Sequence, residues 1–298
     1  MKITITLLFV LIANCAIAQS ITIATYQYAD NPRIKNLEPL ANHLQERMGI
    51  KTQVKSYPTI QLFIEAIQQG EVDVAFINTF GYLLLETSHK KHVMVPSLVM
   101  QGPDTVKADY KTAFVAAATS PVKTWKDVKT YAGQTHLALV FTGSTAGNLV
   151  PRLGLTALNI NDAEQYFKKV SYAGTHANAL QYLLKDSADL AAMGSAELEK
   201  LSPQEKSQLR VIWTSPEIPL GPALINTKLN KELQRKITEE LINLDKTNNL
   251  AFSGLKSAWS EAKTTTHFIA ISKNYYQPFL QHFGATKYVN AILQQFAN

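Results

Sequence analysis

The sequence predicts an α/β protein of two Rossmann-like lobes joined by a hinge. Short apolar runs alternate with amphipathic helical segments almost throughout the chain, which is the pattern of parallel strands connected by helices. The alternation forms two series of roughly a hundred residues each, a usual length for one compact unit. Short irregular segments near residues 108–112 and 214–222 separate the two series, and the second is rich in proline and glycine.

The first series has the pattern of a parallel sheet with helical crossovers. Leu37, Leu40 and Leu44 recur at helical spacing, and Gly49 and Gly70 are expected to end the two helices. Such a β-α-β-α-β order requires right-handed crossovers. The predicted strands and helices alternate at residues 21–25, 37–48, 51–57, 60–69 and 72–77.

The second series repeats this alternation. Strands are predicted at 113–118, 136–141, 168–172, 188–193 and 211–214, with helices beginning near 124, running through 158 and spanning 176–184. A further strand at 223–225 precedes helices at 231–244, 278–283 and 288–296. If these last helices return to the first lobe, two chain crossings form a hinge. We therefore expect lobe 1 to comprise 19–110 plus 216–298, and lobe 2 to comprise 111–215.

The N-terminus is predicted to be a signal peptide covering residues 1–18. Lys2 precedes an apolar run at 3–13, and Ala16-Ile17-Ala18 is a small-x-small cleavage site, so the mature protein is expected in the periplasm. A lipid anchor on Cys15, the only cysteine, is the alternative, but Asn14 is a poor residue before a lipidated cysteine. Cleavage after Ala18 leaves no cysteine and excludes disulfides and thiol catalysis.

Charge and histidine spacing exclude other classes of partner. The formal charge of +6 is scattered, without a basic stripe interleaved with aromatic residues, so nucleic-acid binding is disfavoured. A modest positive field would attract an anionic ligand. His89 and His92 are separated by Lys90 and Lys91, which disfavours a cation site, and no other histidines have metal-ligand spacing. We expect a monomer without metal or cofactor.

The segment 136–151 carries the clearest functional signal. A predicted strand enters the small residues Thr142-Gly143-Ser144-Thr145-Ala146-Gly147, and a helix follows. The first amides of a helix have no internal partners and lie at the positive end of its dipole. Together with the hydroxyls of Ser144 and Thr145, they are suited to a tetrahedral oxyanion. Simple helix capping by these hydroxyls is the alternative interpretation.

Motifs of enzymes are missing from the sequence. Gly-Lys-Ser/Thr does not follow the small-residue turn, and the Gly-x-Gly-x-x-Gly pattern is absent, so nucleotide chemistry has no support. An exported hydrolase would need a nucleophile, a base and an orienting acid in one cleft. The sequence contains neither a Gly-x-Ser-x-Gly elbow nor a His-Glu-x-x-His motif, and we expect no enzymatic activity.

Several segments together resemble one protein family. Ser144 to Arg152 is similar to the Ser-Thr-Ser-Gly-Tyr-Leu-x-Pro segment of the phosphate, phosphite and phosphonate-type periplasmic binding proteins of ABC transporters. The resemblance covers nearly the whole mature chain and implies a type II periplasmic-binding fold that captures phosphorus oxyanions or their relatives. Further similar segments, in the family's order, are Tyr28 to Gly49, Val72 to Tyr82, Gly174-Thr175-His176 and Trp213 to Pro219.

Two departures from the family narrow the expected ligand. Ala146 replaces the family's second serine and removes a hydroxyl donor. Phosphonate binders that hold an aminoalkyl ligand have acidic residues where this chain has Ala177-Asn178 and Met193-Gly194-Ser195. An ammonium group desolvated without a carboxylate partner is costly, so a small amine-free oxyanion is expected. The residues expected to bind it are Tyr28, Asn78, Thr79, Tyr82, Ser144, Thr145, Ala146, Gly147 and His176.

Two functions remain open at this stage. In the first, the protein closes its lobes around phosphate, phosphite, a phosphonate or a relative such as arsenite, and delivers it to an ABC permease. In the second, a periplasmic sensor subunit of the same fold presents the oxyanion to a membrane histidine kinase. The residues themselves do not distinguish these two membrane partners.

Overall fold

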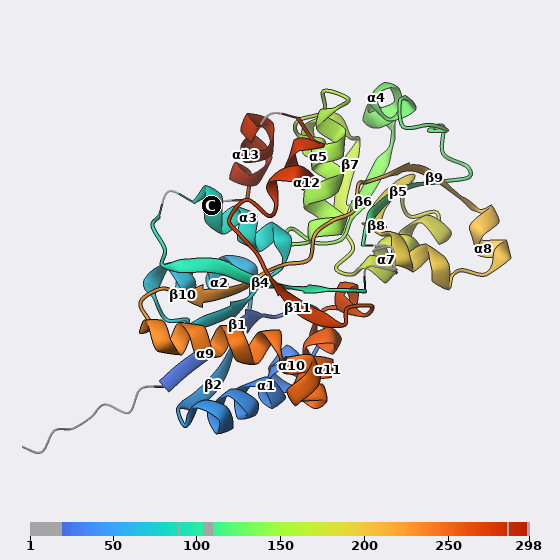
Figure 1. The fold of residues 1–298 in the computed structure, drawn as a ribbon. Coiled ribbons are helices and arrows are strands. Elements are labelled where there is room, and N and C mark those ends of the chain that lie inside the picture. The colour runs from blue at the N-terminus through green and yellow to red at the C-terminus, as the bar shows by residue number, and fades with distance from the viewer. Residues whose placement is uncertain (1–19, 89, 104–109, 285, 297–298) are drawn as a thin grey trace, which may run out of the picture.

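The protein is described by a computed structural model that covers residues 20–88, 90–103, 110–284 and 286–296 (Figure 1). The predicted signal peptide, Cys15 and His89 lie outside these residues. The chain forms two sheets, each flanked by helices, so the α/β architecture with two lobes is confirmed. No helix among the described residues has the length and apolar character needed to cross a membrane.

The first lobe is built on a six-stranded sheet with the order β11-β4-β10-β3-β1-β2. Its strands β1, β2 and β3 are parallel, as predicted, whereas β10 and β11 run antiparallel to their neighbours. Strands β4 and β11 were not predicted from the sequence. The strands are β1 (Ser20–Tyr26), β2 (Lys51–Tyr57), β3 (Val74–Phe76), β4 (Met94–Gln101), β10 (Ala223–Asn226) and β11 (His267–Ala270).

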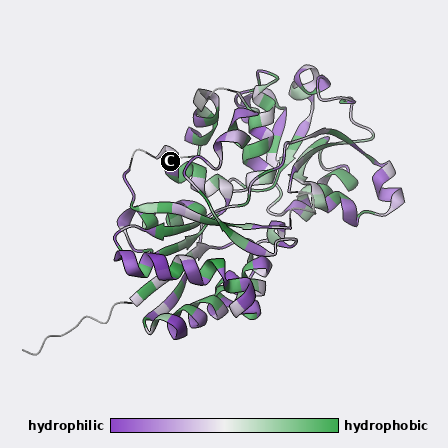
Figure 2. Ribbon diagram, viewed as in Figure 1, coloured by the Kyte–Doolittle hydropathy of each residue, from purple (hydrophilic) through white to green (hydrophobic). Residues whose placement is uncertain are grey.

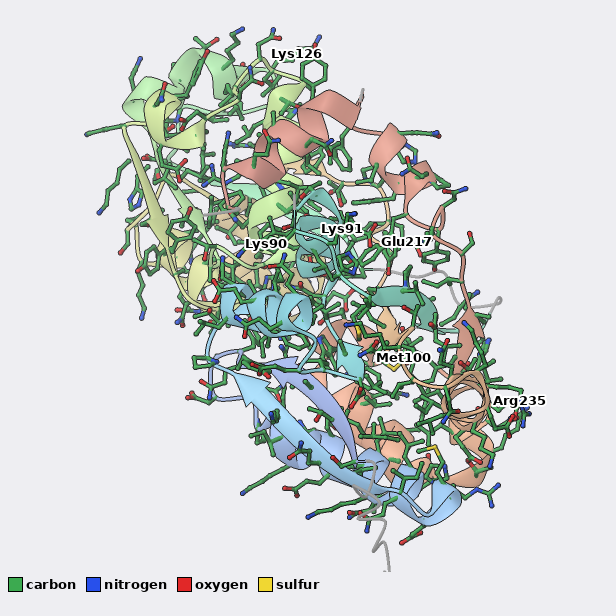
Figure 3. The ribbon with its side chains drawn as sticks, turned by 90° about the vertical axis from the view of Figure 1, so that its left-hand side faces the viewer. Lys90, Lys91, Met100, Lys126, Glu217 and Arg235 are labelled. Carbon is green, nitrogen blue, oxygen red and sulfur yellow. The ribbon has the colours of Figure 1, made fainter. Side chains whose placement is uncertain are left out.

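Helices cover both faces of this sheet. Apolar side chains of α1, α9 and α11 pack on one face, and those of α2, α3 and α13 pack on the other. Met100 points into the core between the sheet and helices α1, α9 and α11, whereas Arg235 on α9 lies at the surface (Figure 3). The helices that belong here are α1 (Arg33–Met48), α2 (Ile60–Gln69), α3 (Thr79–Thr87), α9 (Lys231–Ile242), α10 (Leu244–Thr247) and α11 (Asn249–Ala258).

Local sequence explains where the first two helices end. Gly49 and Gly70 take left-handed backbone angles, with φ of 66° and 79°, which terminate α1 and α2 at the predicted positions. Thr59 begins α2 by accepting a hydrogen bond from the amide of Leu62. The segment after β3 forms helix α3, which was not predicted from the sequence.

The second lobe contains a five-stranded sheet with the order β7-β6-β8-β5-β9. The strands β7, β6 and β8 are parallel, but β5 runs antiparallel to both β8 and β9. The antiparallel directions of β5 and β10 were not predicted, because helical crossovers in a sequence do not reveal which strands pair. The strands are β5 (Thr112–Ala117), β6 (His136–Leu139), β7 (Lys169–Tyr172), β8 (Leu190–Gly194) and β9 (Leu209–Thr214).

Short helices surround the second sheet, and apolar residues concentrate on its strands (Figure 2). The predicted helix after residue 142 begins with a π-helical turn at Thr145–Leu149 before α5 continues it. The helices of this part are α4 (Asp127–Tyr131), α5 (Val150–Thr156), α6 (Ala163–Tyr166), α7 (His176–Leu184) and α8 (Pro203–Ser207).

Two connections between the lobes lie side by side. The amide of Ile218 donates to the carbonyl of Tyr110 at 2.8 Å, and Thr112 and Ser215 exchange hydrogen bonds of 2.9 and 3.0 Å. The two predicted crossings are therefore held together. The residue bounds of the lobes stay a prediction, because α12 (Gln277–Gln281) and α13 (Thr286–Gln294) lie beside α5 as well as α3 (Figure 1).

Candidate ligand-binding site

A cavity of about 100 Å³ lies between the two lobes. Its walls are formed at the carboxyl ends of β1 and β3 from the first sheet and of β6 and β7 from the second, the edge where ligands bind in open α/β sheets. The lining residues are Tyr26, Tyr28, Asn31, Arg33, Asn78, Tyr110, Phe141, Ser144, Thr145, His176, Ala258, Ser260 and Glu261. Five of the predicted site residues, Tyr28, Asn78, Ser144, Thr145 and His176, are among them.

The turn at Ser144 is shaped by its own hydrogen bonds. The Ser144 hydroxyl accepts from the amide of Gly147 at 3.0 Å, and the Ser144 amide donates to the Phe141 carbonyl at 3.0 Å. A Cβ at position 147 would collide with Val140, so glycine is required there. The amides of Ser144 and Gly147 are therefore satisfied within the turn, so the expectation that the first amides of this helix are free for an anion is wrong for these two, and Ser144 caps the helix. The Ser144 hydroxyl lines the cavity and, because it only accepts in the turn, keeps its proton available there.

Thr145 connects the two lobes at the cavity wall. Its buried hydroxyl oxygen accepts from the amide of Phe80 in the first lobe at 3.0 Å. Burial raises the pKa of Tyr110 well above its usual value, although hydrogen bonds from the Thr145 side chain and the Ala146 amide lower it. The Tyr110 phenol is therefore neutral and gives the cavity another hydroxyl.

His176 contributes a neutral imidazole. Its Nδ1 lies 2.9 Å from the amide of Gly194, which can only donate, so Nδ1 is the acceptor and Nε2 carries the proton. Burial lowers the pKa of His176 to about 4. At neutral pH the ring therefore contributes an uncharged N–H donor.

Asn78 and Tyr28 bring the first lobe to the same cavity. The Asn78 carbonyl oxygen caps α3 by accepting from Gly81 at 2.9 Å, while its amide nitrogen donates to the Gly143 carbonyl of the other lobe at 2.9 Å. The ring of Tyr28 packs against Phe141 of the other lobe, with 5.3 Å between centroids. Burial raises the pKa of Tyr28 to about 12, so its hydroxyl stays protonated.

The cavity also contains two ionisable side chains, those of Arg33 and Glu261, that are not among the predicted site residues. Arg33 is only 5% exposed and donates through Nε and Nη1 to the carbonyls of Ala258 and Tyr26, at 3.0 and 3.1 Å. Burial raises the pKa of Glu261, while the charge of Arg33 partly offsets this rise. The helix start after Asn31-Pro32 is a weak signal for Arg33, and no local pattern identifies Glu261.

Four predicted residues do not line the cavity. Thr79 donates to the carbonyl of Pro219 in the second crossing, and Tyr82 points from α3 into the core against Tyr276, with 4.9 Å between ring centroids. The side chain of Ala146 is buried in an apolar cluster, and Gly147 is fully engaged in the turn. Helix α3 accounts for the position of Tyr82, because it directs that side chain into the core.

The site is rich in neutral hydrogen-bond donors. Hydroxyls, an amide and an imidazole N–H surround the space, and Arg33 adds a single fixed positive charge. In a cavity with little water, such donors bind an anion more strongly than they would in bulk solvent. Across the described residues, no cluster of His, Cys, Asp and Glu is arranged to hold a metal ion.

Known proteins match this chain over most of its length. Residues 23–276 match the sequence model of a family described as the ABC transporter, phosphonate, periplasmic substrate-binding protein. The phosphonates-binding periplasmic protein of Escherichia coli is 24% identical over 212 residues, which span 70% of this chain and 61% of that protein. The alignment thus covers less than two thirds of that relative.

Solved structures share the fold. A Xanthomonas citri protein with bound ATP superposes with a TM-score of 0.72 at 19% identity, covering 93% of this chain and 97% of that one. PhnD1 of Prochlorococcus marinus, solved with methylphosphonate, superposes with a TM-score of 0.65 at 14% identity, covering 89% of this chain and 97% of that one. These similarities confirm the fold class of two α/β lobes with a hinge.

Proposed function

Because the chain belongs to the family of ABC transporter phosphonate periplasmic substrate-binding proteins, we propose that it captures a small phosphorus oxyanion outside the cytoplasm. Phosphite, phosphate and methylphosphonate are the ligands that fit best. One observation supports this proposal most strongly: donors from both lobes, including Tyr28, Ser144 and His176, meet at one cavity. Each of these side chains offers a proton to an oxygen atom.

Size supports a small ligand. The cavity of about 100 Å³ is larger than the volume of about 10–15 Å³ that a single water needs. A tetrahedral group with a short substituent occupies a comparable volume. Larger organic phosphonates would require the lobes to separate further.

Contacts between the lobes support binding by closure. The Asn78 amide reaches the Gly143 carbonyl and the Phe80 amide reaches the Thr145 hydroxyl, both across the cavity wall. A ligand that bridges the two walls would favour this closed arrangement over an open one. We propose that the closed protein then docks on an ABC permease. Delivery to a sensor kinase would use the same closed form.

Isothermal titration calorimetry with phosphite, phosphate, methylphosphonate and arsenite tests the proposal. We expect saturable binding of at least one phosphorus oxyanion with a micromolar or lower Kd, equivalent to about 8 kcal/mol or more. Sulfate serves as a tetrahedral control and is expected to bind more weakly. A folded protein that binds none of the phosphorus compounds would contradict the proposal.

A further inference from the structure

Arg33 lies in a cage of aromatic rings at the edge of the cavity. Its guanidinium carbon is 4.5 Å from the centroid of the Tyr26 ring, 4.8 Å from that of Trp259 and 5.5 Å from that of Tyr28. All three distances are within the range of cation–π attraction. Two carbonyls hold the guanidinium in place, those of Ala258 and Tyr26. The side chain is therefore a fixed cation.

Glu261 lines the same cavity and places a carboxyl group beside the aromatic rings around Arg33. Its carboxyl interacts electrostatically with Arg33 and accepts a long hydrogen bond from the Ser260 hydroxyl, at 3.5 Å. Aromatic faces beside a carboxyl group form the environment that proteins use to bind ammonium groups. In this chain the protein's own guanidinium occupies that environment.

We propose that Arg33 is a specificity-determining residue: it occupies the part of the ligand site that would bind a cation, and it thereby excludes phosphonates carrying an amine. The inference rests on the proposed function and deepens it by naming the ligand class: phosphorus oxyanions with uncharged substituents. A ligand ammonium would have to approach a buried guanidinium, and like charges in a low-dielectric site repel strongly. The oxyanion itself gains from the same positive charge.

Glu261 does not provide a binding site for the amine of a ligand. Burial raises the pKa of its carboxyl, because the surroundings disfavour the charged form, and Arg33 is already its charged neighbour in the cavity. A ligand ammonium would therefore compete with the protein's own guanidinium for this carboxyl group. This agrees with the sequence at 177–178 and 193–195, where no acidic residue occurs.

The test compares two ligands of equal size, aminomethylphosphonate and ethylphosphonate, which differ by an ammonium group in place of a methyl group. Calorimetry at pH 7 is expected to show that the wild type binds ethylphosphonate at least about tenfold more tightly. The variant Arg33→Met keeps most of the side-chain volume but removes the charge, and the preference for ethylphosphonate should fall to within about threefold. Its affinity for methylphosphonate should fall about tenfold, since a charged hydrogen-bonding group is lost.

Two further variants serve as controls. Arg33→Lys keeps a cation in the cage and should keep the preference against the amine. Arg47→Met removes an arginine from the same helix, where the side chain is 58% exposed and pairs with Glu240, and should leave both affinities unchanged. Folding of each variant is checked by circular dichroism.

The outcomes separate this inference from the proposed function. If the wild type binds aminomethylphosphonate and ethylphosphonate with equal affinity, the inference is overturned by that measurement alone. It is also overturned if folded Arg33→Met prefers ethylphosphonate as strongly as the wild type does. If the wild type binds methylphosphonate but neither member of the pair, size rather than charge selects the ligand, and the inference is also overturned. If it binds no phosphorus oxyanion at all, the proposed function itself fails.

Discussion

Replacing Asn78 by aspartate is expected to weaken binding of the oxyanion by about 100-fold or more. The substitution removes the amide that donates to the Gly143 carbonyl at 2.9 Å and sets a carboxylate oxygen against that carbonyl. It also places a negative charge on the wall of the anion cavity. The lost hydrogen bond and the repulsion together amount to about 3 kcal/mol or more, which corresponds to about two orders of magnitude in Kd.

The fold is expected to tolerate this change. Asn78 begins α3 by accepting from the Gly81 amide, and aspartate accepts there equally well, with its charge favoured at a helix N-terminus. Asn230→Asp is the matched control, because Asn230 caps α9 through the Leu233 amide at 2.8 Å on the protein surface. Calorimetry with methylphosphonate should show normal affinity for the control. Comparable affinity for both variants would contradict the assigned role of Asn78.

Replacing Thr145 by valine is expected to reduce affinity about 30-fold to 100-fold. The side chain keeps its shape, but the Phe80 amide loses the hydroxyl oxygen that accepts its proton at 3.0 Å across the lobes. A buried amide left without a partner costs about 1–3 kcal/mol, and the Tyr110 phenol at the cavity also loses the hydrogen bond from the Thr145 hydroxyl. Because the Phe80 contact joins the two lobes, its loss should disfavour the closed form.

Thr156→Val is a suitable control for this experiment. Thr156 lies on α5, directly after the turn that contains Thr145, and its hydroxyl donates only to the Leu153 carbonyl within the same helix, at 2.7 Å. Its replacement should change affinity by less than about twofold. Small-angle scattering with and without methylphosphonate would show whether Thr145→Val stays more open. Wild-type affinity and wild-type compaction in Thr145→Val would argue against a closure role.

Much of the fold was predictable because helix and strand periodicities are local signals. Helix α7 begins and ends where the pattern predicts, and Gly49 and Gly70 end their helices as expected. The directions of β5 and β10 were not predictable, because strand pairing depends on contacts far apart in the sequence. Helix α3 was missed because Phe80 to Leu85 is a continuous apolar run, which carries no amphipathic pattern.

The candidate site was predictable in part for the same reason. Small residues between a strand and a helix identify the turn at Ser144, and Thr175-His176 begins a helix after β7. Glu261, by contrast, follows α11 near the end of the chain and meets Arg33 only through the tertiary fold. The surroundings of Arg33 depend on the tertiary fold in the same way, because its hydrogen-bond acceptor Ala258 is 225 residues away in the sequence.

A crystal structure of the full chain grown with methylphosphonate is the most direct test of the central claim. We expect electron density for one phosphonate in the cavity between the lobes, with oxygen atoms within hydrogen-bonding distance of the Ser144 hydroxyl and of Nε2 of His176. Anomalous scattering from phosphorus would identify the ligand. A phosphonate bound elsewhere, with only water between Ser144 and His176, would contradict the account.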